Sequence, residues 1–157
     1  MTAAERTASG GPSDTAGPDR VPQRASGPVV PPGVPLGELP ELMGIRVQEM
    51  SAERAVGTMP VLGNRQPFGR LHGGAHLVLA ETLASLAAWT HAGPGREALG
   101  VEIGASHTGG ATSGVVTGTC EALSLGRTLT VHEVVVRDEA GRRLSTVRVT
   151  NLLRDTP

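Results

Sequence analysis

A single carboxylate, that of Glu81, stands within a run of small and apolar residues from Leu71 to about Ala92. The run is the only long stretch with helical character, and apolar residues fall nearly all round its helical wheel, so we predict a buried helix. A buried, unpaired carboxylate is destabilising by several kcal/mol unless it is hydrogen-bonded or neutralised. Either Glu81 pairs with an arginine or caps a neighbouring turn, or its position serves a reaction.

The predicted helix is apolar on two opposite sides. One stripe comprises Leu71, Ala75, Val78, Leu79, Thr82, Leu86 and Trp89, and the other comprises Ala80, Leu83, Ala84, Ala87 and Ala88.

The residues before this helix favour the second reading of Glu81. Pro67 and Gly69 predict a loop, and Gly73-Gly74 at the start of the helix leave backbone N–H groups accessible. A helix N-terminus stabilises negative charge through these N–H groups and the helix dipole. An acyl oxygen under nucleophilic attack acquires such a charge. The segment therefore offers donors for an oxyanion and, farther along, a carboxylate that can activate water or attack.

The spacing of these groups predicts a dimer. Gly74 and Glu81 lie on nearly the same side of the helix but about 10 Å apart along its axis. One carbonyl carbon does not easily contact both, so the simplest arrangement places Glu81 of one chain opposite the Gly74 N–H of another. Ser85, one turn after Glu81, is positioned to orient the carboxylate or a water molecule.

The elements that hold this helix are strands. Alternation over Met43–Val47 and the extended run 55–62 predict a first hairpin, preceded by a helical turn. Four strand candidates follow the helix, at 97–107, 113–125, 127–138 and 142–153. The last two are joined by a hairpin turn at 138–141 with Gly141 where positive φ is useful. Strands around one helix indicate an α+β domain with a largely antiparallel sheet.

Composition narrows the function classes. The formal net charge of −1 and only two aromatic residues, Phe68 and Trp89, argue against nucleic-acid binding. The absence of lysine excludes a Schiff-base mechanism. Cys120 is the sole cysteine, which excludes an internal disulfide and a cysteine zinc site. Neither a membrane span nor a signal peptide is recognisable, and we expect a cytoplasmic protein.

The chain divides into two parts. Residues 1–38 are rich in Gly, Pro, Ser and Ala, and we expect a disordered tail. Residues 39–154 form the predicted domain, which is long enough for one core.

A resemblance covers the whole predicted domain. The residues that carry it are Gln66-Pro67-Phe68-Gly69-x-Leu71-His72-Gly73-Gly74-Ala75, Leu79-Ala80-Glu81-Thr82, Gly100-Val101-Glu102-Ile103, His107, Leu125-Gly126-Arg127 and Asp138-Glu139-x-Gly141-Arg142. This pattern resembles the hotdog-fold acyl-CoA thioesterases, in particular the phenylacetate-pathway type and the proofreading thioesterase of enterobactin synthesis. The resemblance implies a curved antiparallel sheet wrapped around one central helix, in dimers that usually pair into tetramers.

The resemblance also implies roles for individual residues. Glu81 would be the nucleophile or general base, and Gly74 N–H would polarise the thioester carbonyl. Gln66 and His72 would hold the carbonyl or position water. The residues expected to contact substrate or coenzyme A are Gly73, Gly100, His107, Thr108, Gly109, Gly110, Ser124, Leu125, Gly126, Arg127, Thr128 and Leu129. Arg127 is the expected phosphate partner. Coenzyme A belongs to the substrate, and we expect no resident cofactor.

The remaining histidines form no recognisable constellation. His72 and His76 have metal-ligand spacing on a helix, but no third ligand follows, so we expect no metal site and a surface or interface position for His76. His91 and His132 are expected to be structural. The segment after His107 could be only a flexible turn, while the resemblance favours a ligand-contacting loop.

Three functions stay open at this point. The first is hydrolysis of an acyl-CoA thioester with an aromatic or medium-chain acyl group, and an acyl-carrier-protein thioester, which presents the same pantetheine arm, stays open as a substrate. The second is a non-catalytic acyl-CoA-binding module, which has no need of Glu81. The third is a hydratase or dehydratase on the same fold, whose motifs have no match here. For the first, we expect Ala84, Ala88 and Trp89 to line the acyl pocket.

Overall fold

The computed structural model describes residues 36–157, which form one sheet and two helices. In chain order the elements are α1 (Glu38–Leu42), β1 (Arg46–Met50), β2 (Arg54–Pro60), α2 (Gly73–Ala92), β3 (Arg96–His107), β4 (Val115–Leu125), β5 (Leu129–Arg137) and β6 (Arg143–Asp155). The predicted tail 1–38 lies outside the described residues except for its last three. Of these, Leu36 packs against the core and Glu38 begins α1.

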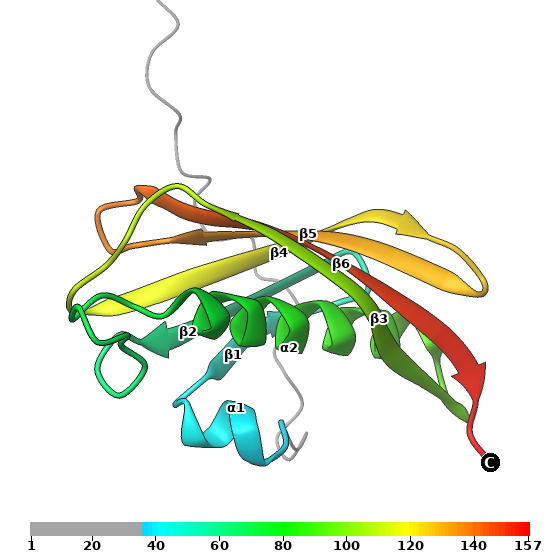
Figure 1. Ribbon diagram of the computed structural model, residues 1–157. Coiled ribbons are helices and arrows are strands. Elements are labelled where there is room, and N and C mark those ends of the chain that lie inside the picture. Colours follow the sequence, from blue (N-terminus) through cyan, green and yellow to red (C-terminus); the bar gives the residue numbers. More distant parts are fainter. Residues whose placement is uncertain (1–35) are drawn as a thin grey trace, which may run out of the picture.

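The six strands form one antiparallel sheet in the order β1-β2-β4-β5-β6-β3. The sheet curves around α2, which lies along its concave side, while α1 lies beside β1 at the open side (Figure 1). The expected curved antiparallel sheet around one long helix is therefore confirmed.

Two glycines let α2 lie close to the sheet. Gly57 of β2 and Gly118 of β4 are direct cross-strand partners. A Cβ atom on either one would come within 2.9 Å of a methyl carbon of Leu83. The Leu83 side chain, which is fully buried, therefore sits where two neighbouring strands lack side chains.

The predicted helix begins two residues later than expected. The Leu71 N–H donates to the carbonyl oxygen of Ala111 at 2.8 Å, and Leu71 pairs with Arg65 in an isolated bridge. His72 then has an extended backbone and caps the helix. Leu71 therefore belongs to the loop before α2, because its backbone bonds to Ala111 and bridges to Arg65 rather than joining the helix.

The strands after α2 match their predicted ranges within one to two residues, and the first hairpin is displaced. Its first strand, β1, begins at Arg46 rather than Met43, because the α1 segment continues to Leu42 and turns at Gly44 with φ of 71°. The β4–β5 turn is also longer than predicted. The Gly126 N–H donates to the carbonyl oxygen of Leu129 at 3.0 Å, which places residues 126–128 in the turn.

Candidate active site

Helix α2 buries one face against the sheet and leaves the other open in this chain. Eight residues form the buried face: Ala75, His76, Leu79, Ala80, Leu83, Ala84, Ala87 and Ala88. Glu81 is exposed, and Trp89 is 46% exposed. The prediction of a helix buried all round, with Glu81 inside, is therefore wrong for the single chain, since the sheet covers only one side of α2.

Glu81 lies at the edge of the α2–sheet contact, above β3. Its Oε1 atom is 2.9 Å from the point that a Cβ atom on Gly100 would occupy. The carboxylate therefore rests in space that any other residue at position 100 would fill. This contact joins two of the predicted site residues within one chain.

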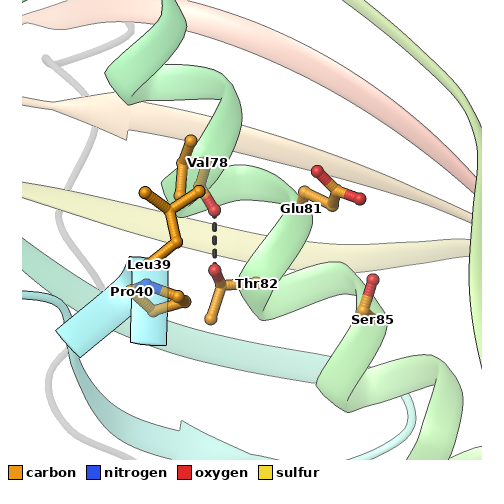
Figure 2. Close-up of a pocket in the computed structure, with 6 residues that line it drawn as sticks. All are labelled: Leu39, Pro40, Val78, Glu81, Thr82 and Ser85. Carbon is orange, nitrogen blue, oxygen red and sulfur yellow. Dashed lines mark hydrogen bonds between the residues drawn. The ribbon is translucent and has the colours of Figure 1, made fainter. Parts of the chain in front are cut away.

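A hollow of about 260 Å³ opens beside Glu81. Its lining comprises Leu39, Pro40, Val78, Glu81, Thr82 and Ser85. Figure 2 shows Glu81 and Ser85 one turn apart on α2, with Leu39 and Pro40 of α1 across from Val78 and Thr82. The Thr82 hydroxyl donates to the Val78 carbonyl at 2.7 Å, so this polar side chain is satisfied by its own helix. Glu81 is the only ionisable side chain in this lining.

The predicted acyl pocket does not form around Ala84 and Ala88 in this chain. Ala84 and Ala88 are fully buried against the sheet, so they line no open space in this chain. The hollow uses α1 instead, and residues Leu39, Pro40, Val78 and Thr82 were missed. A small residue on an all-apolar helix gives no signal of whether it faces the sheet or the hollow.

Ser85 is tied to the sheet rather than to Glu81. Its hydroxyl donates to Oδ1 of Asn151 in β6 at 3.0 Å. Asn151 is fully buried and was not among the predicted site residues. The alternating pattern of β6 could have indicated an inward side chain at this position, next to the inward-facing Val149.

The N-terminus of α2 combines His72, Gly73 and Gly74. The Nδ1 atom of His72 accepts the Gly74 N–H at 2.8 Å, so the ring caps the helix. A neutral ring that accepts through Nδ1 carries its proton on Nε2, which is then a donor. Gly73 N–H has no acceptor among residues 36–157. Of the two glycines, Gly73 is the one whose N–H is open.

His107 lies against the same helix N-terminus. Its Nε2 is 3.1 Å from the point that a Cβ on Gly73 would occupy, and its Nδ1 is 3.0 Å from the Ser145 hydroxyl. The His107 ring also stacks in a tilted arrangement on His76, with centroids 5.2 Å apart. His107, the first residue of the predicted ligand-contacting loop, therefore belongs to the helix N-terminus.

His76 is buried, with 2% of its surface exposed, and the expected surface or interface position is wrong. Burial and the neighbouring His107 lower the pKa of His76 to about 4. The sequence did not show that His76 faces the sheet, because apolar residues lie nearly all round the helical wheel of α2. In the structure His76 lies next to Ala75 on the face of α2 that packs on the sheet.

Gln66 sits in a tight loop before α2. The Gln66 N–H donates to the Arg70 carbonyl at 2.7 Å, and the Gly69 N–H donates to the Gln66 carbonyl at 2.9 Å. Gly69 has φ of 75°, the left-handed conformation that glycine adopts without strain. The backbone of this loop is fixed, while the Gln66 side chain is half-buried.

The two predicted coenzyme A segments lie at opposite ends of α2. The first follows His107 beside Gly73, and Arg142 donates to the Gly110 carbonyl there at 3.1 Å. The second lies at the far end, where the His91 Nε2 is 3.2 Å from the Gly126 carbonyl. Because α2 has 20 residues, about 30 Å separates its ends, and the two segments do not meet within one chain.

The first of these segments is ordered by the β5–β6 hairpin. The N–H groups of Thr108 and Gly109 both donate to the Leu144 carbonyl, at 2.9 and 3.1 Å. In the second segment, the exposed Arg127 has its carbonyl oxygen bonded to Arg96. His132 is buried and bonds the Ala52 carbonyl at 3.1 Å, a contact that holds the β1–β2 turn.

Within the described part of the chain, no group of three or more His, Cys, Asp or Glu side chains is arranged to hold a metal ion. Neither of its helices is both long and apolar enough to cross a membrane.

Comparisons with known proteins agree with this geometry. Residues 68–145 match the family model described as the thioesterase superfamily. A proofreading thioesterase of Cronobacter turicensis is 43% identical over 115 residues, covering 73% of this chain and 84% of the relative. A 1,4-dihydroxy-2-naphthoyl-CoA hydrolase of Escherichia coli is 36% identical, with coverage of 74% and 87%.

A solved structure of a thioesterase from Haemophilus influenzae superposes with a TM-score of 0.71 at 32% identity, covering 74% of this chain and 82% of that one. Similarity of this extent, on a fold with one helix inside a curved sheet, fixes the family. The chain belongs to the thioesterase superfamily and is a hotdog-fold enzyme that hydrolyses thioesters.

Proposed function

We propose that the protein hydrolyses acyl-CoA thioesters to a free acid and coenzyme A, with Glu81 as the nucleophile or general base. The observation that carries this proposal is the hollow beside α2, in which Glu81 is the only ionisable group. Hydrolysis requires a base or nucleophile within reach of the reacting carbonyl. No resident cofactor takes part in the proposed reaction, since coenzyme A enters and leaves as part of the substrate.

The helix N-terminus supplies the proposed oxyanion donor. Because the Gly74 N–H is hydrogen-bonded to His72, the open donor is one residue earlier, at Gly73. In this proposal the Nε2–H of His72 holds the thioester carbonyl together with the Gln66 side chain. Donors aimed at the developing negative charge lower the barrier to attack.

A homodimer completes the proposed site. Gly73 and Glu81 are eight residues apart on α2, about 12 Å along the axis, so one carbonyl does not reach both within a chain. The open face of α2 continues into exposed apolar side chains, Leu39 at 54% and Trp89 at 46%. Apolar surface of this kind is typical of protein contacts. Pairing of the dimers into a homotetramer is part of the same proposal.

The proposed substrates carry an aromatic or medium-length acyl group. The apolar part of the hollow is lined by Leu39, Pro40 and Val78, and its volume of about 260 Å³ has room for a compact acyl group. The E. coli relative is named for hydrolysis of an aromatic acyl-CoA, which supports this class. The coenzyme A segments around His107 and Arg127 would come together across the dimer. A cytoplasmic location belongs to this proposal as well.

The relatives are named as hydrolases, so the alternative of a non-catalytic acyl-CoA-binding module is set aside. Hydration of an enoyl-CoA is likewise not supported by any comparison above.

Glu81→Gln tests the proposal. We expect turnover of acyl-CoA thioesters, followed as thiol release, to fall at least about a hundredfold, since the amide neither attacks nor accepts a proton. A matched control is Glu121→Gln, because Glu121 is an exposed carboxylate of β4 that pairs with Arg54 of β2. Full turnover in Glu81→Gln would overturn the assignment, and wild-type activity on no coenzyme A thioester would overturn the substrate class.

A single turnover in ¹⁸O-labelled water separates the two roles of Glu81. Attack by the carboxylate releases the coenzyme A thiolate and forms a mixed anhydride, and water that opens the anhydride at the Glu81 carbonyl leaves label in Glu81. General-base catalysis places label only in the released acid.

A further inference from the structure

One polar side chain interrupts the inward-facing row of β6. Val147, Val149 and Leu153 point into the core at alternate positions, and Asn151 occupies the place between Val149 and Leu153. Its side chain is fully buried. Burying a primary amide is unfavourable unless its polar atoms are paired, and a leucine or valine would suit the row better. The position calls for a reason beyond packing.

The Asn151 side chain has one hydrogen bond, and that bond goes to α2. Its Oδ1 accepts the Ser85 hydroxyl at 3.0 Å, while its Nδ2 has no partner among the described residues. The Asn151 side chain therefore bonds Ser85 through Oδ1, while both hydrogens of its Nδ2 group stay without an acceptor among the described residues.

Asn151 also lies beside the Glu81 carboxylate. Asn151 and Gly100 are direct partners in the β3–β6 pairing. From the point that a Cβ on Gly100 would occupy, Glu81 Oε1 is 2.9 Å away and Asn151 Oδ1 is 3.9 Å away. Both side chains thus converge above the same glycine, on the side of α2 that carries the hollow.

We propose that Asn151 is a positioning residue that fixes the Ser85 hydroxyl as a hydrogen-bond acceptor toward the hollow, and so orients the attacking water. The inference rests on the proposed function. Because the Ser85 proton is used by Asn151, the hydroxyl offers only lone pairs to the hollow. Ser85 and Glu81 are one helical turn apart, close enough for one water to bridge them.

In this arrangement the water donates one hydrogen to Ser85 Oγ and the other to the Glu81 carboxylate. Glu81 takes the second proton while the water oxygen forms a bond to the thioester carbon. The tetrahedral intermediate then collapses, the carbon–sulfur bond breaks, and the coenzyme A sulfur receives the proton from Glu81. The ¹⁸O label is accordingly expected in the free acid only, and label in Glu81 would overturn this role of the water.

Asn151→Leu tests the inference, since leucine fits the apolar row but accepts no hydrogen bond. We expect kcat to fall about tenfold, the rate equivalent of one hydrogen bond, with KM within about twofold. The melting temperature should not fall, because an incompletely paired buried amide is replaced by an apolar side chain. Thr130→Val is the matched control. Thr130 is the buried cross-strand neighbour of Asn151 in β5, its hydroxyl has no partner in the described part of the chain, and kcat should be unchanged.

A double-mutant cycle separates positioning from a structural role. If Asn151 acts through Ser85, the variant with both Ser85→Ala and Asn151→Leu should be no slower than Ser85→Ala alone. Additive losses would show that Asn151 acts independently of Ser85 and would overturn the inference.

Asn151→Asp allows a second measurement, the pH dependence of kcat, which a change in packing alone would not shift. The aspartate keeps the acceptor for Ser85, so we expect kcat near that of the wild type above the acidic limb. The added negative charge beside Glu81 disfavours its ionised form, so the acidic limb of the kcat profile should move to higher pH. An unmoved limb would place Asn151 away from Glu81 and count against the inference.

Different results would overturn the hydrolase assignment and the positioning role of Asn151. If Glu81→Gln is inactive while Asn151→Leu keeps full kcat, the hydrolase assignment stands and only the positioning role falls. If the wild type hydrolyses no coenzyme A thioester, the proposed substrate class falls and this inference falls with it.

Discussion

At the residue scale, Glu81 depends on a neighbour that has no side chain. Its Oε1 atom occupies the space above Gly100 of β3, 2.9 Å from the point that a Cβ atom there would take. The same gap admits Asn151 from the adjacent strand. Glycine is therefore needed at position 100 to leave space for the Glu81 carboxylate, and not because of its backbone conformation.

Gly100→Ala is expected to disable the enzyme without unfolding it. The new methyl group would lie 2.9 Å from Glu81 Oε1, and the flexible glutamate would move rather than the backbone. A carboxylate displaced by about 1 Å loses its alignment, and we expect kcat to fall by about tenfold to a hundredfold with little change in melting temperature.

Gly104→Ala in the same strand provides the control. Its added Cβ would contact only the exposed Glu102 side chain, at 3.3 Å. Equal losses in both variants would show that β3 tolerates no alanine and would leave the Gly100–Glu81 contact without a special role.

At the element scale, α2 separates two tasks on two faces. Its sheet-facing side is made mainly of alanine and leucine and seats Leu83 against Gly57 and Gly118. The only polar residue on that side is His76, whose Nδ1 has no partner among residues 36–157. The burial that fixes the helix therefore also holds this histidine in its neutral form.

The pKa of His76 predicts how stability depends on pH. The folded value of about 4 is below the ordinary 6.5, so between these values the unfolded chain binds a proton that the folded chain does not. The free energy of unfolding is expected to be fully present above pH 6.5. It should fall toward pH 4, by at most about 1.4 kcal/mol per pH unit for this group, and then level off.

Urea unfolding of the wild type and His76→Leu across this pH range measures the effect. In the variant, the free energy of unfolding should change less steeply with pH than in the wild type. His132, whose pKa is also lowered by burial, should account for part of the pH dependence that is left. Identical slopes for the two proteins would exclude His76 as the source.

At the scale of the whole molecule, the chain holds two incomplete halves of the proposed site. The donors at His72 and Gly73 lie at one end of α2, Glu81 lies in its middle, and the segment around Gly126 lies at the other end. A two-fold axis across the open face of α2 would bring the end of one helix beside the middle of the other.

Mixing two inactive variants tests this assembly. Dimers formed from Glu81→Gln and Gln66→Ala chains contain, in the mixed species, one site with both substitutions and one site with neither. Random pairing should then restore about one quarter of the wild-type activity. Each variant alone, carried through the same refolding, is the control. No recovery on mixing, with mixed dimers demonstrated by mass, would place the whole site within one chain.

Much of the fold could be read from the sequence because its signals are local. The apolar run from Leu71 predicted α2 to within two residues, and the four strand candidates after it predicted β3 to β6. The first strand begins later than predicted because the chain turns at Gly44, with φ of 71°, before β1 begins. The pairing of Glu81 with a glycine-rich helix start was likewise visible, since both lie on one continuous segment.

The tertiary structure decided which side of each element faces the core. A helix that is apolar all round gives no direction for the sheet, so Ala84 and Ala88 were assigned to a pocket and His76 to the surface, while all three are buried against strands. Asn151 was also missed, because its contacts are with Ser85 and Gly100, which are 66 and 51 positions away in the sequence. Sequence spacing determines neighbours along an element, whereas contacts between elements depend on how the sheet curves around the helix.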